Sequence, residues 1–173
     1  MGVASPFFRH LPLARYGLEW IFPPAAAAHP LDDGTAAVFY RSVAQTAEQL
    51  GQDAAAYRLL MGPLAANWRT MLDAFLGPLR IRHPIAMARF GMRGLFPAST
   101  LARLLFRGDR ARAAFGGLAA HSIMPLEWPA TSAFALMLGM LAHGIGWPMA
   151  HGGSQALANA LVGHLKSLRG RVV

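Results

Sequence analysis

A paired glycine followed by a hydroxyl and an amide side chain is the local motif best suited to touching a ligand. It lies in the stretch HGGSQAL, as Gly152, Gly153, Ser154 and Gln155. Glycine has no Cβ, so its backbone can approach a neighbouring group closely, and serine is favoured at the start of a helix. The spacing predicts a turn into a helix with the Gln155 amide pointing outward. The same pattern is also typical of a purely structural turn into a core helix.

The sequence lacks the patterns of several other catalytic and cofactor-binding sites. It has no cysteine, which excludes disulfides, thiolate metal sites and a cysteine nucleophile. None of the seven histidines stands four residues from another, as in a helical zinc site, so we expect no metal. A Gly-x-Gly-x-x-Gly motif begins at Gly144 and Gly146, but Met149 replaces its third glycine. The Gly-x-Ser-x-Gly elbow of hydrolases and the Walker phosphate loop are missing as well.

The remaining candidates for polar chemistry are isolated histidines and a run of arginines. We expect His121, His143 and His151, which lie in an apolar region, to be satisfied by backbone partners. The chain carries a formal net charge of +8, and eight arginines fall between Arg80 and Arg112. Such a run can be a solvated face, or it can meet phosphate, an anionic membrane or an acidic partner. We expect no nucleic-acid binding, because no base-reading helix or known motif accompanies the charge.

Composition indicates a chain with little polar material to cover its interior. Hydrophobic residues make up 54% of the 173 residues and charged residues 14%, against about a quarter in typical soluble domains. No charged residue occurs from 128 to 165, yet Pro129, the glycines and the polar residues of this stretch favour a buried helix over a membrane span. The N-terminus lacks a secretory pattern, so a cytoplasmic location is the default prediction, with peripheral membrane contact as an alternative.

The elements that must position these residues are predicted to be mainly helices with a few short strands. The first thirty residues contain five prolines and are expected to be irregular connecting chain. A turn at HPLDDG and a strand at 35–40 follow, then a helix capped by Ser42 and another capped by Asp53. The apolar repeat over 57–75 predicts helix, divided at Gly62 and Pro63. Further helices are predicted at 84–94, 99–106, 109–119, 130–143 and 154–168, the last ended by Gly170.

Four stretches of the chain together resemble the phytoene-desaturase-like FAD-dependent oxidoreductases, in the branch that includes pyridine nucleotide-disulphide oxidoreductase domain proteins and retinol saturases. They are SPFFRHLPLARYGLEWI, HPLDDGTAAVFYRS, AAHSIMPLEWPATSAFALMLGMLAHGIGWPMAHGGSQALANAL and RGRVV. The resemblance implies a two-domain Rossmann-type flavoenzyme of which this chain is an internal segment, truncated at both ends. Residues 1–150 would belong to the helical substrate domain. Residues 151–173 would return to an incomplete FAD-binding domain, with a strand beginning at Arg171.

The resemblance also implies a reaction and its partners. Such enzymes transfer a hydride from an apolar or amine-like substrate to the flavin, and Gly152, Gly153, Ser154 and Gln155 would pass near the flavin or substrate cavity. It assigns no catalytic residue. Because the Gly-rich FAD fingerprint is missing, we expect no stable FAD complex and no turnover without the remaining parts of the enzyme. The alternatives are a free-standing helical interaction module and a peripheral membrane protein without catalysis.

Overall fold

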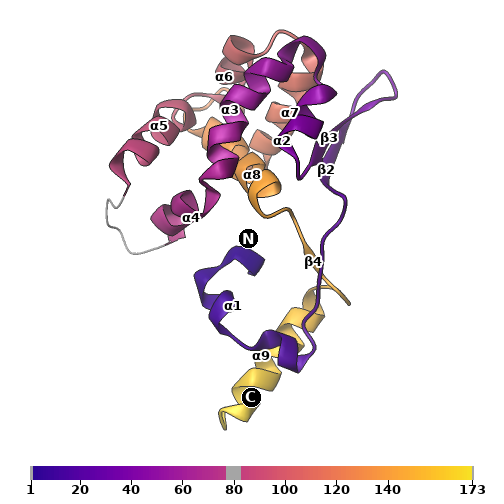
Figure 1. The fold of residues 1–173 in the computed structure, drawn as a ribbon, viewed down its shortest axis with the longest axis vertical. Coiled ribbons are helices and arrows are strands. Elements are labelled where there is room, and N and C mark those ends of the chain that lie inside the picture. The colour runs from indigo at the N-terminus through magenta and orange to yellow at the C-terminus, as the bar shows by residue number, and fades with distance from the viewer. Residues whose placement is uncertain (1, 77–82, 173) are drawn as a thin grey trace. The chain divides into compact units, whose positions relative to one another are not determined.

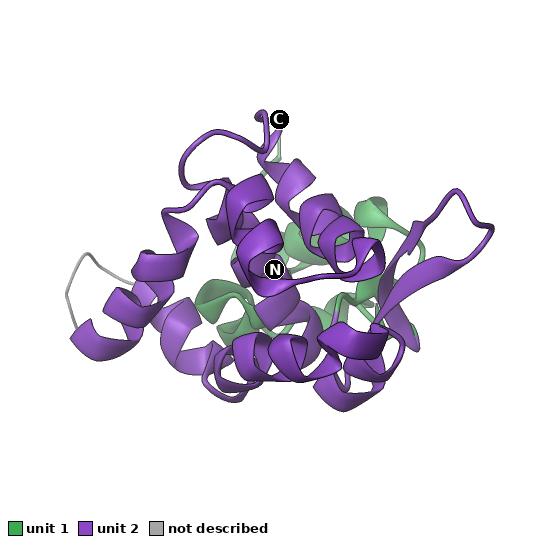
Figure 2. Cartoon of the chain, turned by 90° about the horizontal axis from the view of Figure 1, so that it is seen from above, with its two compact units in different colours: residues 1–23, 147–173 green, residues 24–146 purple. Residues whose placement is uncertain are grey.

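The computed structural model describes residues 2–76 and 83–172, and it is mainly helical, as predicted (Figure 1). The chain forms two compact units, shown in different colours in Figure 2. Unit 1 comprises residues 1–23 and 147–173, and unit 2 comprises residues 24–146. The boundary expected near residue 150 concerns a larger protein and stays a prediction.

Unit 2 begins with an antiparallel hairpin. Strand β2 (Ala25–Pro30) pairs with β3 (Ala36–Tyr40), and Ala28 lies opposite Val38. The turn between them was predicted, and Gly34 in it adopts a φ of +77°. The strand predicted at 35–40 is confirmed, but β2 was expected to be connecting chain. Alanine has a low strand propensity, so pairing with β3 rather than local preference makes this segment a strand.

Seven helices of unit 2 are described, and α8 lies among them (Figure 1). Helix α8 packs against α3, α5 and α7, and the described core contains Phe39, Tyr57 and Leu136. A Cβ on Gly139 of α8 would lie 2.9 Å from Cε of Met61, so the glycine permits close packing of α8 on α3. The helices are α2 (Val43–Glu48), α3 (Ala54–Ala66), α4 (Trp68–Leu76), α5 (Pro84–Gly94), α6 (Ala98–Leu105), α7 (Asp109–Ala119) and α8 (Thr131–Gly144).

Most helix boundaries agree with the predictions, and one does not. The helices predicted at 84–94 and 109–119 have these bounds, and those predicted at 99–106 and 130–143 are displaced by one residue. The division predicted at Gly62 and Pro63 is wrong, because α3 continues through Pro63 and the chain turns at Asn67. A proline removes one helical hydrogen bond, whereas the Asn67 side chain donates to the Pro63 carbonyl at 2.9 Å and stabilises the later turn.

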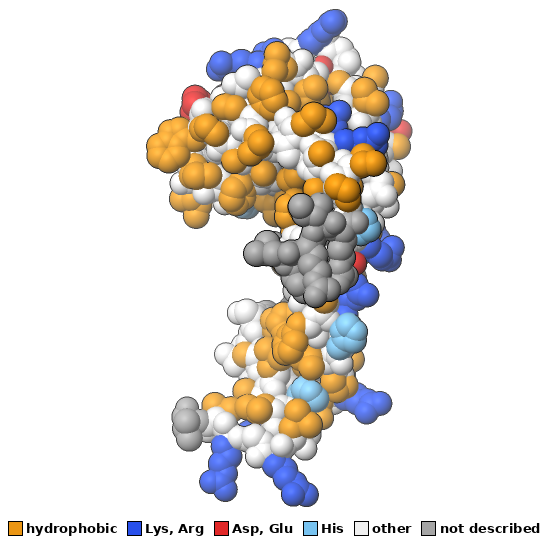
Figure 3. All heavy atoms as spheres, turned by 90° about the vertical axis from the view of Figure 1, so that its left-hand side faces the viewer, with side chains coloured by type: hydrophobic (Ala, Val, Ile, Leu, Met, Phe, Trp, Pro, Cys, Tyr) orange, Lys and Arg blue, Asp and Glu red, His pale blue; other side chains and the backbone are white. Residues whose placement is uncertain are grey.

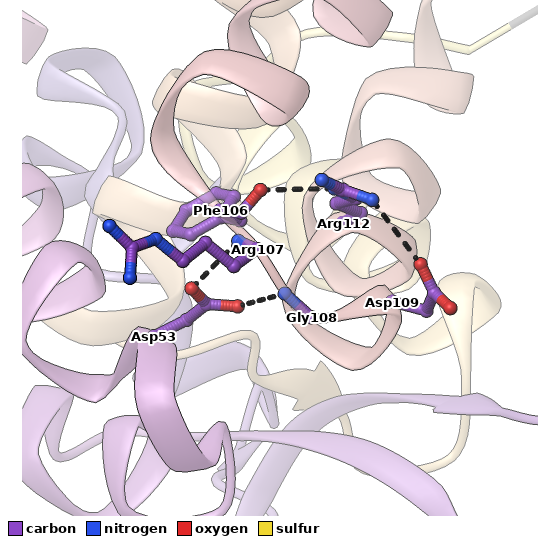
Figure 4. Close-up of polar contacts among 6 residues, drawn as sticks. All are labelled: Asp53, Phe106, Arg107, Gly108, Asp109 and Arg112. Atoms are coloured by element: carbon purple, nitrogen blue, oxygen red, sulfur yellow. Dashed lines mark hydrogen bonds and ion pairs between the residues drawn. The ribbon is translucent and has the colours of Figure 1, made fainter.

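Of the two predicted caps, Ser42 behaves as expected and Asp53 does not. The Ser42 hydroxyl accepts a hydrogen bond from the backbone N–H of Gln45 at 3.2 Å. Asp53 precedes α3, but its side chain makes no capping bond to that helix. Its buried carboxylate accepts from the backbone N–H groups of Arg107 at 2.8 Å and Gly108 at 2.7 Å (Figure 4). The carboxylate therefore anchors the chain at the start of α7.

Unit 1 is built from the first and last segments of the described chain. Helix α1 (Pro6–His10) and a 3₁₀ turn (Leu13–Tyr16) lead to β1 (Trp20–Ile21), and β4 (Met149–Ala150) leads to α9 (Ser154–Ser167). Strands β1 and β4 are antiparallel. A small core of Leu13, Leu18 and Ala160 holds the segments together. The N-terminal chain, predicted to be irregular, thus contains short ordered elements because its apolar side chains pack against α9.

The end of α9 differs from the prediction in one residue. Arg169, not Gly170, takes the left-handed conformation, with a φ of +64°. The N–H of Gly170 donates to the carbonyl of Leu165 at 2.9 Å, which is the bond of a Schellman motif. A Cβ on Gly170 would lie 2.3 Å from Cδ1 of Leu165, so a larger residue here would require that side chain to move. Arg171 and Val172, where a strand was predicted, pair with no described segment, and residue 173 lies outside the described residues.

The uncharged stretch from 128 to 165 contains the buried helix that was predicted. Nine residues of α8, from Thr131 to His143, are buried within unit 2. None of the helices within residues 2–76 and 83–172 has the length and apolar character needed to cross a membrane.

Candidate functional site

The predicted glycine turn is present, and its backbone conformation requires glycine. Gly152 and Gly153 have φ values of +77° and +80°. Gly153 also has a ψ of −170°, a combination that is essentially confined to glycine. Its N–H donates to the carbonyl of Ala150 at 2.9 Å, which closes the turn directly after β4. The chain is therefore reversed sharply before α9 begins at Ser154.

The start of α9 presents polar groups to the outside. Gly153 occupies the N-cap position and has no side chain to accept from the first N–H groups of the helix. Such groups lack partners within a helix and carry its positive dipole end, which suits a polar or anionic group. The side-chain amide of Gln155 donates to Oδ1 of Asn159 at 2.9 Å. Gly152, Gly153, Ser154 and Gln155 are all exposed, so Gln155 points outward as predicted.

The space beside the turn decides whether a larger group such as a flavin has room there. A Cβ on Gly153 would meet no atom within 4 Å, so the space beside this backbone is open. In unit 1, a hollow of about 200 Å³ lies elsewhere, lined mainly by apolar side chains such as Phe8, Leu11 and Trp20. The four residues fit contact with one side of a cofactor, and any enclosing walls would have to come from other groups. Their role near a flavin stays a prediction.

A buried Tyr–His pair is the best-defined polar arrangement in unit 2. Nδ1 of His143 lies 2.9 Å from the backbone carbonyl of Tyr40, so we assign the ring proton to Nδ1. Nε2 then accepts from the hydroxyl of Tyr57 at 2.7 Å. Burial lowers the pKa of His143, against the raising effect of its bonds to the Arg41 and Tyr40 carbonyls, and burial raises the pKa of Tyr57. Both polar side chains are satisfied inside the core, which indicates a structural role.

The prediction of a backbone partner is confirmed for the side chain of His143. His121 and His151 are exposed. Histidine His29 of β2 lies against α7, where a Cβ on Gly117 would fall 2.3 Å from its Cε1. Among the described side chains, no group of three or more His, Cys, Asp or Glu residues could hold a metal ion.

The arginine run divides into two groups, and Arg80 and Arg82 lie outside the described residues. Arg110 and Arg112 make hydrogen bonds within unit 2, the second of them to the Phe106 carbonyl at 3.0 Å and, as an ion pair, to Asp109 at 3.5 Å (Figure 4). The side chains of the other four are exposed and make no hydrogen bond or ion pair within the described part of the chain. They are Arg89, Arg93, Arg103 and Arg107.

A hollow between α3, α4 and α5 was not predicted from the sequence. Its volume is about 100 Å³, and Leu60, Leu64 and Met71 line it together with Arg89 and Arg93. The sequence signal was the spacing of the two arginines, which places both on one face of a helix. The same helix had been predicted, but only tertiary packing brings its arginines beside the apolar stripe of α3.

Comparisons of the chain with protein-family models, with curated proteins and with solved structures find no match.

Proposed function

We propose that this chain is the helical substrate region of an FAD-dependent oxidoreductase of the phytoene-desaturase-like kind, together with the segment that returns to its FAD-binding domain. The observation that carries the proposal is the pairing of β1 with β4, which leads directly into the glycine turn and α9. The sequence resemblance names the family. The paired strands are the two chain connections by which a helical substrate region would be joined to an FAD-binding domain.

The pairing places the outgoing and returning chain side by side. Trp20 lies opposite Ala150 and Ile21 opposite Met149, and the N–H of His151 donates to the carbonyl of Glu19 at 2.9 Å. Residues 24–146 form one compact unit between these two strands. This is the topology of a helical region inserted into another body. In the proposed enzyme, that other body is the FAD-binding domain.

Exposed apolar side chains on unit 1 support the proposal that a larger partner covers this unit. Ile21 and Phe22 are about half exposed, and on α9 and its end Leu165 and Leu168 are 41% and 67% exposed. Large exposed apolar residues on so small a unit fit a surface that is covered in an assembly. We propose that the missing N- and C-terminal parts of the flavoenzyme cover them.

In the proposed enzyme, bound FAD would supply the chemistry by accepting a hydride from an apolar or amine-like substrate. The chain's own contribution would be shape and orientation. Gly152 and Gly153 would let the backbone approach the flavin or substrate cavity, and Ser154 and Gln155 would offer polar groups at its edge. No side chain is assigned a catalytic role. This polypeptide alone would not retain FAD, and the proposed location is the cytoplasm.

Flavin absorbance of purified protein tests the proposal. The chain is expressed alone and, separately, with the coding sequence that flanks it in the genome. We expect a yellow flavoprotein only in the second case, with loss of colour when the flanking Gly-rich motif is mutated. Flavin bound by the isolated chain would contradict the proposed division of the site. A colourless but folded joined protein would contradict the proposed function.

Peripheral membrane attachment is a second candidate function, favoured by one surface of unit 2. Figure 3 shows hydrophobic side chains spread over one face of unit 2. Met92 of α5, Leu95 at its end and Leu104 of α6 are each more than 60% exposed. Exposed arginines accompany them, and basic apolar surfaces bind anionic membranes. Co-sedimentation with phosphatidylglycerol vesicles at low salt tests this function, and failure to sediment would exclude it.

A further inference from the structure

The hollow between α3, α4 and α5 has an apolar floor and a basic rim. Leu60 and Met71 at its floor are buried, and Leu64 is half-buried. Arg89 and Arg93 line the same hollow from α5 and are exposed. An outer hollow of about 400 Å³ shares Asn67, Ala86 and Arg89 with it and is lined by polar and apolar side chains alike, so the space continues from the apolar hollow toward the surface.

The two arginines are placed to bind an anion. They stand one helical turn apart on α5, where like charges repel each other. The described chain gives neither guanidinium a hydrogen bond or an ion pair, and no acidic residue occurs from 74 to 108. Arg93 lies in the last turn of α5, where the helix dipole stabilises a cation, but Arg89 lies in the middle of the helix and gains little from it.

We propose that this hollow binds a single-chain amphiphile with an anionic head, a carboxylate or a phosphate. The apolar chain would lie against Leu60, Leu64 and Met71, where it is removed from water. The head would accept charge-assisted hydrogen bonds from Arg89 and Arg93, whose planar donor groups match carboxylate and phosphate oxygens. The site lies within unit 2 and needs no flavin, so it is separate from the proposed function.

Isothermal titration calorimetry of the whole 173-residue chain tests the site. The ligands are decanoate, decyl phosphate, decanol and decylamine, each kept below its micelle concentration. We expect decanoate and decyl phosphate to bind at least about tenfold more tightly than decanol, since a hydrogen bond to a charged group contributes enough for that ratio. Decylamine should bind most weakly. Equal affinity for decanol and decanoate, or no binding of either anion, would overturn the proposal.

Three variants locate the site. Replacing both arginines in one double variant, R89Q with R93Q, should lower the affinity for decanoate about tenfold or more. The affinity for decanol should not change. R103Q is the matched control, because Arg103 is also exposed and unpaired but lies on α6 outside the hollow. A86L narrows the hollow and should weaken the binding of decanoate and of decanol alike. Circular dichroism checks that each variant is folded, and decanoate affinity that is unchanged in R89Q with R93Q would contradict the site.

Two further ligands distinguish the sources of the anion. Inorganic phosphate should bind far more weakly than decyl phosphate, because it has no chain to bury. Phosphatidylglycerol vesicles test the membrane surface as the source. Sedimentation with vesicles in the absence of any binding to monomeric decanoate would overturn the proposal, since the arginines would then face a lipid surface rather than hold a ligand.

Discussion

His143 shows how one buried side chain can make the stability of unit 2 depend on pH. Its Nδ1–H donates to the Tyr40 carbonyl, and its Nε2 accepts from the Tyr57 hydroxyl only when Nε2 is unprotonated. Burial lowers the pKa of His143 from its ordinary value of 6.5, so below that pH the unfolded chain binds the proton more readily than the folded one. The resulting stability is fully present above pH 6.5 and is lost as the pH falls.

We therefore predict that the free energy of unfolding decreases below pH 6.5, by up to about 1.4 kcal/mol per pH unit for each such histidine. His29 contributes in the same direction, because burial and, secondarily, the nearby His121 lower its pKa. Urea unfolding at several pH values measures the slope, which H143Q should flatten. H151Q alters an exposed histidine and serves as the control. A slope that H143Q leaves unchanged would contradict this assignment.

Asp53 provides a second prediction at the residue scale. Its buried carboxylate accepts two backbone N–H bonds at the start of α7, and each bond to a charged acceptor contributes about 1.5–3 kcal/mol. D53A should lower the free energy of unfolding by about 3 kcal/mol or more, and D53N, which keeps one acceptor oxygen, by less. Denaturant titration gives these values. D109A is the control, since its exposed carboxylate lies at the same helix start and should leave stability nearly unchanged.

These two residues show what the sequence can and cannot predict about side chains. A histidine in an apolar stretch was expected to have a backbone partner, and His143 has one. The sequence could not identify Tyr57 as its second partner, because the two are 86 residues apart. From its local position, Asp53 was predicted to cap the helix that follows it. Its carboxylate instead accepts from the backbone N–H groups of Arg107 and Gly108. Long-range partners are set by tertiary packing, which local spacing does not encode.

At the scale of elements, the start of α9 depends on the backbone freedom of Gly153. A substitution there is strained by conformation alone, because its Cβ would meet no other atom within 4 Å. G153A should therefore lower the stability of unit 1 by about 1–3 kcal/mol. G62A is the matched control, because Gly62 also has open space but lies inside α3, where alanine stabilises by about 0.5–1 kcal/mol. Thermal unfolding of both variants measures the difference, and equal effects would refute the conformational argument.

Helix positions were predictable because their ends carry local signals. Pro84 at the start of α5 and Asp109 at the start of α7 are such signals, and both helices begin where they were predicted. The prediction failed where local preference and packing disagree. Pro63 is inside α3 although proline disfavours that position, and the alanines of β2 form a strand because β3 pairs with them. For the candidate site, the turn, the helix start and the outward direction of Gln155 could all be predicted, because local spacing determines them.

At the scale of the whole molecule, the two units should differ in stability. Among the described residues, four apolar side chains are buried in unit 1, namely Ala4, Leu13, Leu18 and Ala160, whereas unit 2 has a much larger core. Local stability follows the amount of buried apolar contact. We predict that amide hydrogens of α9 exchange with deuterium faster than those of α8 in the isolated chain, as measured by mass spectrometry. In the proposed flavoprotein, in which the chain is expressed together with its flanking sequence, α9 should become protected while α8 changes little. Equal protection of both helices in the isolated chain would contradict this.

The adjacent strands β1 and β4 also bear on how the protein could be engineered. Ile21 and Met149 lie opposite each other in the ladder, close enough for a two-residue hairpin turn to join them. Replacing residues 22–148 by Asn-Gly would connect the strands and leave a miniature of unit 1. Conversely, the helical unit could be grafted as a cassette into another hairpin. Because the paired strands β1 and β4 flank residues 24–146 in the sequence, this unit could be moved into another protein through two adjacent connections.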